Sequence, residues 1–217
     1  MGRLRLRHHP DALDCPRMVG VGLQRYEQHL FCLRFGRGGS GGSESENQER
    51  SQIMKRIRQY VGILTALVVY YIIHEGAHLL YALANGVFKQ INFMALGVQI
   101  DVFRDCMTDT QLGLFCLAGA VATFLTGWIL VLLCRKICAM ESKVLKAVFW
   151  YVTIALLVLD PLYLSVLCGF FGGGDMNGIR LLMPEVVARI LFAIIGVIHI
   201  MVIWKYLLPK YKESFNS

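Results

Sequence analysis

Four long apolar segments limit what this chain can fold into. They lie at 59–84, 112–133, 144–168 and 187–208, and each is close to the roughly 20 residues that a helix needs to cross a bilayer core. Hydrophobic residues make up 56% of the 217 residues and charged residues only 17%, which lies outside the usual range for a soluble domain. The sequence therefore predicts an all-α, multi-pass integral membrane protein with about four transmembrane helices.

The basic residues predict how these helices are oriented. Three clusters flank the apolar segments, and with four spans all three fall on one side of the membrane: Lys55, Arg56, Arg58; Arg135, Lys136, Lys143, Lys146; and Lys205, Lys210, Lys212. Because cytoplasmic flanks carry the excess of Lys and Arg, we expect both termini in the cytoplasm. The same clusters account for much of the net charge of +7, so we expect contact with the lipid bilayer and no nucleic-acid binding.

The first 53 residues differ in kind from the rest. They are rich in Arg, Gly, Ser and Glu, and 36–43 is a Gly/Ser run, which predicts a flexible or disordered basic tail and linker followed by a membrane-embedded domain at 54–217. Met54 directly precedes a basic flank and the first apolar segment, so it is an alternative natural start to Met1.

A cluster of ionisable residues lies inside the first apolar segment, where such residues are rare. His74 and His78 are four residues apart, so on a helix both imidazoles point to the same side. This is a zinc-ligand spacing, and Glu75 stands beside the ligands, where a general base would be needed. The pattern predicts a Zn²⁺ site with His74 and His78 as metal ligands and Glu75 as the catalytic base.

A catalytic zinc site takes a third protein ligand and leaves one position open. Asp175 follows the third span, which should end on the same side as the histidines, and its Gly-rich surroundings favour irregular backbone. Asp160 lies deeper in the same segment, so it is either the alternative ligand or a carboxylate that orients a histidine. In the fourth span, His199 is expected to serve helix packing or to lie at the interface.

Two further stretches concern the surroundings of this cluster. Residues 87–102 alternate in polarity in places around Gly97 and predict a small β-hairpin, with an interfacial loop as the alternative. The edge of such a hairpin could receive an extended substrate segment by strand addition. In the second span, 117–123 is a patch of small residues that lets helices approach closely.

These residues together resemble the site-2-protease family of intramembrane zinc metalloproteases, the M50 peptidases. His74-Glu75-Gly76-Ala77-His78 matches the family's His-Glu-x-x-His helix. Ala118-Gly119-Ala120 with Thr123 is similar to its second-core-helix pattern, in which a proline follows Ala-Gly and an asparagine comes shortly after. Asp175 resembles the family's third zinc ligand, although Gly178 is three residues on and Asp160-Pro161 stands where the family has an Asn-x-x-Pro arrangement.

The resemblance covers about 59–178 and implies a minimal, core-only member of the family. It implies a zinc metalloendopeptidase, a hydrolase acting on membrane-embedded or membrane-proximal segments of membrane protein substrates. The alternative is a non-proteolytic zinc-binding membrane protein that acts as a partner-binding module. An intact Glu75 favours the protease, because a purely structural zinc site needs no base.

Overall fold

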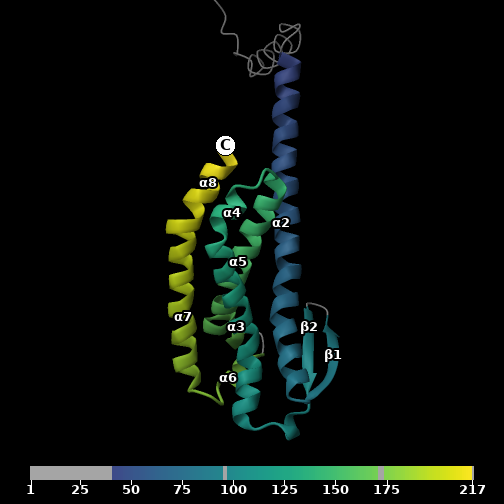
Figure 1. Cartoon of the computed structure of the whole chain (residues 1–217), viewed down its shortest axis with the longest axis vertical. Helices are drawn as coiled ribbons and strands as arrows, with labels where there is room; N and C mark the ends of the chain where they lie inside the picture. The colour runs from purple at the N-terminus through teal and green to yellow at the C-terminus, as the bar shows by residue number, and fades with distance from the viewer. Residues whose placement is uncertain (1–40, 95–96, 171–173, 217) are drawn as a thin grey trace, which may run out of the picture. The chain divides into compact units, whose positions relative to one another are not determined.

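A computed structural model describes residues 41–94, 97–170 and 174–216. The chain divides into two compact units, Met1–Gln52 and Ile53–Ser217, and the arrangement described below is that of the second. The long helices are α2 (Gly41–Ala84), α3 (Asp109–Leu132), α5 (Lys143–Ser165) and α7 (Glu185–Val202). The shorter elements are β1 (Phe88–Met94), β2 (Gly97–Val102), η1 (Arg104–Cys106), α4 (Cys134–Cys138), η2 (Leu167–Gly169), α6 (Met176–Ile179), the π-helical η3 (Ile203–Leu207) and α8 (Leu208–Asn216) (Figure 1).

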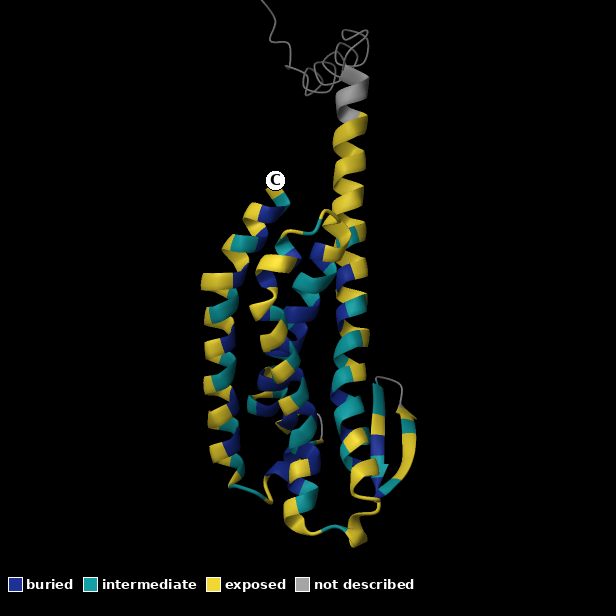
Figure 2. Cartoon of the chain, viewed as in Figure 1, coloured by how far each residue is buried: buried dark blue, intermediate teal, exposed yellow. Residues whose placement is uncertain are grey.

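The structure confirms the four predicted spans and the small sheet. Helices long and apolar enough to cross a membrane occupy Glu46–Ala84, Asp109–Leu132, Lys143–Ser165 and Glu185–Asn216. The outer faces of α2 and α7 expose large apolar side chains, such as Leu64, Ile72, Ile190 and Ile194, and buried residues lie on the faces turned toward neighbouring helices (Figure 2). Such exposed apolar faces suit a lipid environment, because lipid tails are as apolar as these side chains.

The helix α2 begins earlier than the sequence suggests. Its first residue is Gly41, so 41–53 are helical although they belong to the predicted linker. Helix-forming Glu, Gln and Arg residues make up six of these thirteen positions, and Glu46 and Arg50 form an i,i+4 ion pair at 3.6 Å, a spacing that supports a helix. The remainder of the predicted tail, 1–40, lies outside the described residues.

The chain leaves α2 through a glycine and turns into the hairpin. Gly86 has φ +68°, a left-handed conformation that favours glycine and ends helices. The strands β1 and β2 then pair antiparallel, with Ile91 opposite Ile100 and Phe93 opposite Val98. A Cβ added to Gly97 would lie 3.1 Å from the Tyr71 ring, so the start of β2 packs closely against α2.

Helix α5 contains a proline, and its helix bonding is completed by another helix. Pro161 has no N–H to donate to the carbonyl of Leu157, four residues before it. His199 of α7 donates to that carbonyl instead, with Nδ1 2.7 Å from the oxygen, and its Nε2 accepts from Trp128 Nε1 of α3 at 3.2 Å. The buried His199 thus joins three helices, as expected for a packing histidine.

The two ends of the bundle differ in what they carry. Helices α4 and α8 lie at the end where α2 enters the bundle, and the hairpin and α6 lie at the other end (Figure 1). All three predicted basic clusters belong to elements or flanks at the α4 and α8 end. This arrangement puts the residues that start the second unit and those that end it at one end, as an even number of spans requires.

Candidate metal centre

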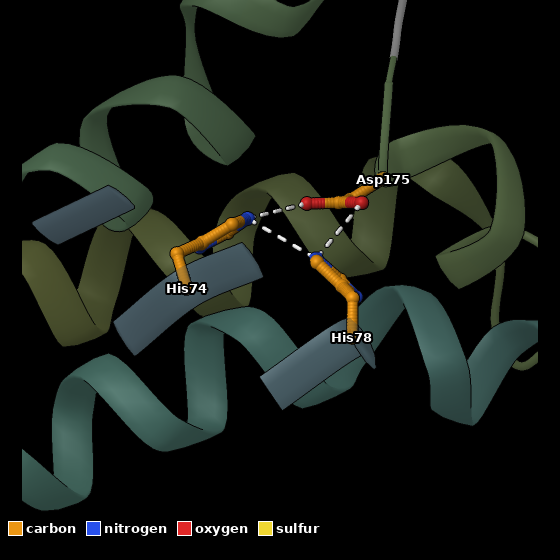
Figure 3. Close-up of side chains that lie close together, drawn as sticks. All are labelled: His74, His78 and Asp175. Carbon is orange, nitrogen blue, oxygen red and sulfur yellow. Dashed lines mark hydrogen bonds and ion pairs between the residues drawn. The ribbon is translucent and has the colours of Figure 1, made fainter. Parts of the chain in front are cut away.

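Three side chains from distant parts of the chain meet near the hairpin end of the bundle. His74 and His78 come from one face of α2, and Asp175 comes from the segment that leads from α5 into α6 (Figure 3). His74 Nε2 lies 3.2 Å from His78 Nε2 and 3.1 Å from Asp175 Oδ2, and His78 Nε2 lies 3.5 Å from Asp175 Oδ1. Within the described residues, this is the one group of three or more His, Cys, Asp or Glu side chains arranged to hold a metal ion.

The second nitrogen of each histidine has a partner behind it. His78 Nδ1 donates to the backbone carbonyl of Phe115 in α3 at 2.7 Å. His74 Nδ1 lies 3.1 Å from Asp160 Oδ1, which is close enough for an ion pair, although the angle is too oblique for a well-formed hydrogen bond. These contacts turn both Nε2 atoms inward and leave them available as ligands.

The structure separates the two carboxylates between which the sequence did not decide. Asp160 is fully buried behind His74, where it accepts a hydrogen bond from the Tyr70 hydroxyl at 2.6 Å and another from the Thr123 hydroxyl. It therefore occupies the position of a carboxylate that orients a histidine. Asp175 alone joins the two Nε2 atoms.

Tyr70 and Thr123 are supporting residues that the sequence did not single out for this task. Tyr70 precedes His74 by four residues, so the helical spacing already places the two side chains on one face, and their rings stack at 5.4 Å between centroids. Thr123 stands at the place where the resembling family has an asparagine, but its hydroxyl is bound to Asp160.

A glycine on α3 makes the cluster sterically feasible. A Cβ built on Gly119 would lie 2.6 Å from His78 Nε2 and 2.8 Å from His74 Nε2, far inside van der Waals contact. The small-residue patch at 117–123 therefore does more than bring two helices together. It keeps one side of the ligand nitrogens free of side-chain atoms.

The spacing of the three ligand groups fits a tetrahedral ion. Around a zinc ion with ligand distances of about 2.0–2.1 Å, neighbouring ligand atoms lie about 3.3–3.4 Å apart. The observed separations of 3.1, 3.2 and 3.5 Å bracket that value. Two imidazoles and one carboxylate also form a donor set that zinc accepts in catalytic sites.

Charge at Asp175 follows from its surroundings. Burial raises the pKa of its carboxyl, but hydrogen bonds to His74 and His78 together with their charge outweigh burial, and the pKa lies below its usual value. The group is thus held as a carboxylate, the form that binds a cation.

The cluster opens into a cavity of about 460 Å³. Its walls include Glu75, the strand β2, the start of α3 and Tyr163 of α5. The half-buried Glu75 lines this cavity beside the two histidines, and the backbone N–H of Ile100 faces its carboxylate. The space is large enough for a few residues of an extended peptide, and a carboxylate, the His74–His78–Asp175 cluster and the strand β2 all border it.

No protein-family model, curated protein or solved structure matches this chain. Function is therefore argued from the chemistry of the site, because a fold of four membrane helices does not by itself imply an activity.

Proposed function

We propose that this protein is an intramembrane zinc endopeptidase. The observation that carries the proposal is the convergence of His74, His78 and Asp175 on a cavity that Glu75 also lines. A site that only held zinc for stability would use a fourth protein ligand, whereas a catalytic site keeps one position open. Among the described residues the ligand group has three members.

In the proposed reaction, a bound ion and the side chains of the protein would have separate tasks. A zinc ion held by His74, His78 and Asp175 would supply a Lewis acid that polarises a peptide carbonyl and makes water a better nucleophile near neutral pH. Glu75 accepts the proton of the attacking water and then delivers it to the nitrogen of the leaving amine. The supporting contacts of His74 and His78 hold the ligand geometry while charge moves.

The hairpin suggests how a substrate segment would be held. The edge of β2 that carries the Ile100 N–H faces Glu75 in the wall of the cavity. An extended segment of a membrane-embedded or membrane-proximal protein could pair with this edge and present its backbone carbonyl to the ligand cluster. Side-chain selectivity would then come from the cavity walls.

The family resemblance supports the same proposal. His74, Glu75 and His78 carry the His-Glu-x-x-His pattern, and Gly119 of the Ala-Gly pair lies against the ligand nitrogens. One of the departures also has an explanation in the structure. Asp160, which stands near the expected Asn-x-x-Pro position, is used to support His74.

Replacement of Glu75 tests the proposal. Tagged single-span membrane proteins would be co-expressed with the wild type, with Glu75→Gln and with Glu185→Gln, a matched control in α7. We expect Glu75→Gln to abolish the cleaved products while the purified variant keeps about one zinc per chain, and Glu185→Gln to cleave normally.

Two other outcomes of this experiment would refute the proposed protease function. Persistent cleavage by Glu75→Gln would contradict the assigned base. Stoichiometric zinc in the wild type with no cleavage of any membrane protein, even in a proteome-wide comparison of cells carrying the two variants, would favour a zinc-binding partner module instead.

A further inference from the structure

Three tyrosines line the cavity, and one of them has a hydroxyl that the fold does not use. Tyr70 donates its hydroxyl to Asp160, and Tyr71 packs its ring edge-on against Tyr70 and over Gly97. The half-buried Tyr163 also lines the cavity, and within the part of the chain that the structure describes its hydroxyl makes no hydrogen bond. A phenol placed at a site in this way is available to a substrate.

The position of this phenol is fixed from two sides. Tyr163 follows Asp160 by three residues on α5, so both side chains leave the same face of the helix toward the histidines. Gly174 has φ +30°, and a Cβ on it would lie 2.5 Å from the Tyr163 hydroxyl oxygen. The hydroxyl therefore rests on the backbone of the residue that directly precedes the ligand Asp175.

Besides the Lewis acid, the proposed hydrolysis would gain from a hydrogen-bond donor to the carbonyl oxygen, which the ligand cluster does not contain. Attack on a peptide carbonyl places negative charge on its oxygen, and a prepositioned donor to that oxygen is often the largest single contribution to catalysis. Glu75 and Asp175 are acceptors when ionised. Thr123, in the small-residue patch of α3, already donates its hydroxyl to Asp160. It is therefore not available to a substrate oxygen.

We propose that Tyr163 is a catalytic residue that donates a hydrogen bond to the developing oxyanion of the substrate. The inference rests on the proposed protease function and deepens it. A bond forms between the water oxygen and the carbonyl carbon, the water proton goes to Glu75, and the carbonyl π pair moves to the oxygen that Tyr163 faces. Tyr163 keeps its proton. When the carbonyl re-forms, the C–N bond breaks and the amine nitrogen takes the proton from Glu75.

The test compares Tyr163→Phe with Tyr71→Phe, which removes a second hydroxyl from the wall of the same cavity. With any membrane substrate found in the Glu75 experiment, we expect Tyr163→Phe to lower kcat about a hundredfold with KM changed less than about threefold. Because the lost interaction forms only in the transition state, Tyr71→Phe should alter kcat far less.

A second measurement does not depend on turnover. Binding of a phosphinic peptide, whose tetrahedral P–O⁻ group mimics the oxyanion, would be followed by calorimetry in detergent. We expect Tyr163→Phe to bind it at least tenfold more weakly than the wild type. A substrate-like peptide with a planar carbonyl, measured in the Glu75→Gln background, should bind equally well with or without the Tyr163 hydroxyl.

The outcomes separate this inference from the function on which it rests. Cleavage by the Glu75→Gln variant would refute the proposed protease function itself. If Glu75→Gln is inactive but Tyr163→Phe has the wild-type kcat, the protease function stands and the proposed role of Tyr163 is overturned. Loss of zinc from Tyr163→Phe would also overturn it, because the residue would then act by maintaining the ligand geometry.

Discussion

Two buried histidine groups in this protein share one kind of hydrogen bond and differ in the partner of the second ring nitrogen. His78 and His199 each direct Nδ1 at a backbone carbonyl of a neighbouring helix, and both distances are 2.7 Å. The second nitrogen of His199 accepts from Trp128, which completes the bonding of a neutral ring. The second nitrogen of His78 faces His74 and Asp175 instead.

The two histidine groups differ in whether the protein itself completes their hydrogen bonding. Polar groups within a bilayer are costly unless they are paired, and His199 satisfies that demand while also replacing the donor that Pro161 lacks. In the ligand cluster, two imidazole nitrogens and a carboxylate point at one common space. The three groups contact one another, and a cation bound between them would pair with all three at once. We therefore expect the same residue type to serve packing in one place and ligation in the other.

Removing one histidine from each group should have the most distinct effects. We expect His78→Ala to reduce bound zinc from about one per chain to near zero, since it deletes a ligand. His199→Ala should keep its zinc but lower the free energy of unfolding by about 1–3 kcal/mol, because it leaves the Leu157 carbonyl and the Trp128 N–H unpaired. Elemental analysis and denaturant unfolding in detergent measure the two effects. Equal zinc loss in both variants would show that the two groups do not differ in function.

The supporting carboxylate should have the next largest effect. Asp160→Asn keeps the size of the side chain but removes the charge that faces His74 Nδ1. Loss of such a supporting carboxylate typically weakens metal affinity 10–100-fold, so zinc should still bind but exchange more readily with a chelator. Asp175→Asn should weaken binding further, as expected for a ligand. Competition titration with a chromogenic chelator checks both, and the reverse order would exchange the roles of the two aspartates.

Two glycines on α3 test whether close packing at the histidine cluster matters more than close packing elsewhere on the helix. In Gly119→Ala the new methyl group would meet both ligand nitrogens, whereas in Gly127→Ala it would lie 2.7 Å from the end of the Leu157 side chain. Leu157 can adjust its rotamer, so Gly127→Ala should cost no more than about 1–3 kcal/mol of stability and leave zinc bound. Gly119→Ala should displace the histidines and lose zinc under the same chelator conditions. Normal zinc affinity in Gly119→Ala would show that α2 and α3 can move apart without harm to the site.

The sequence predicts the elements of this molecule better than the contacts between them. Hydropathy and the i,i+4 spacing are local signals, so the four spans and the shared face of His74 and His78 could be read directly. The choice between Asp160 and Asp175 depends on where α5 ends and on which nitrogen of His74 each carboxylate meets. That is a property of packing between helices. The bonds from Tyr70 and Thr123 to Asp160 join three helices, and no spacing within one segment encodes them.

An ion pair on the hairpin should matter least, because its two side chains are partly exposed. Lys89 Nζ lies 3.0 Å from Asp101 Oδ2, and the hydrogen bond from Lys89 holds the pKa of the Asp101 carboxyl below its usual value. A carboxyl with a lowered folded-state pKa stabilises the fold above its unfolded pKa of about 3.9, and this stabilisation is lost as the pH falls through the folded-state value. The protection factors of the strand amides, which are exchange rates corrected for the intrinsic pH dependence of exchange, should therefore fall at acidic pH in the wild type. Lys89→Met should lose most of that fall. Zinc affinity at neutral pH should stay unchanged, because solvent screens the pair. An altered zinc affinity in Lys89→Met would show that the hairpin and the ligand cluster are coupled more tightly than their separate contacts indicate.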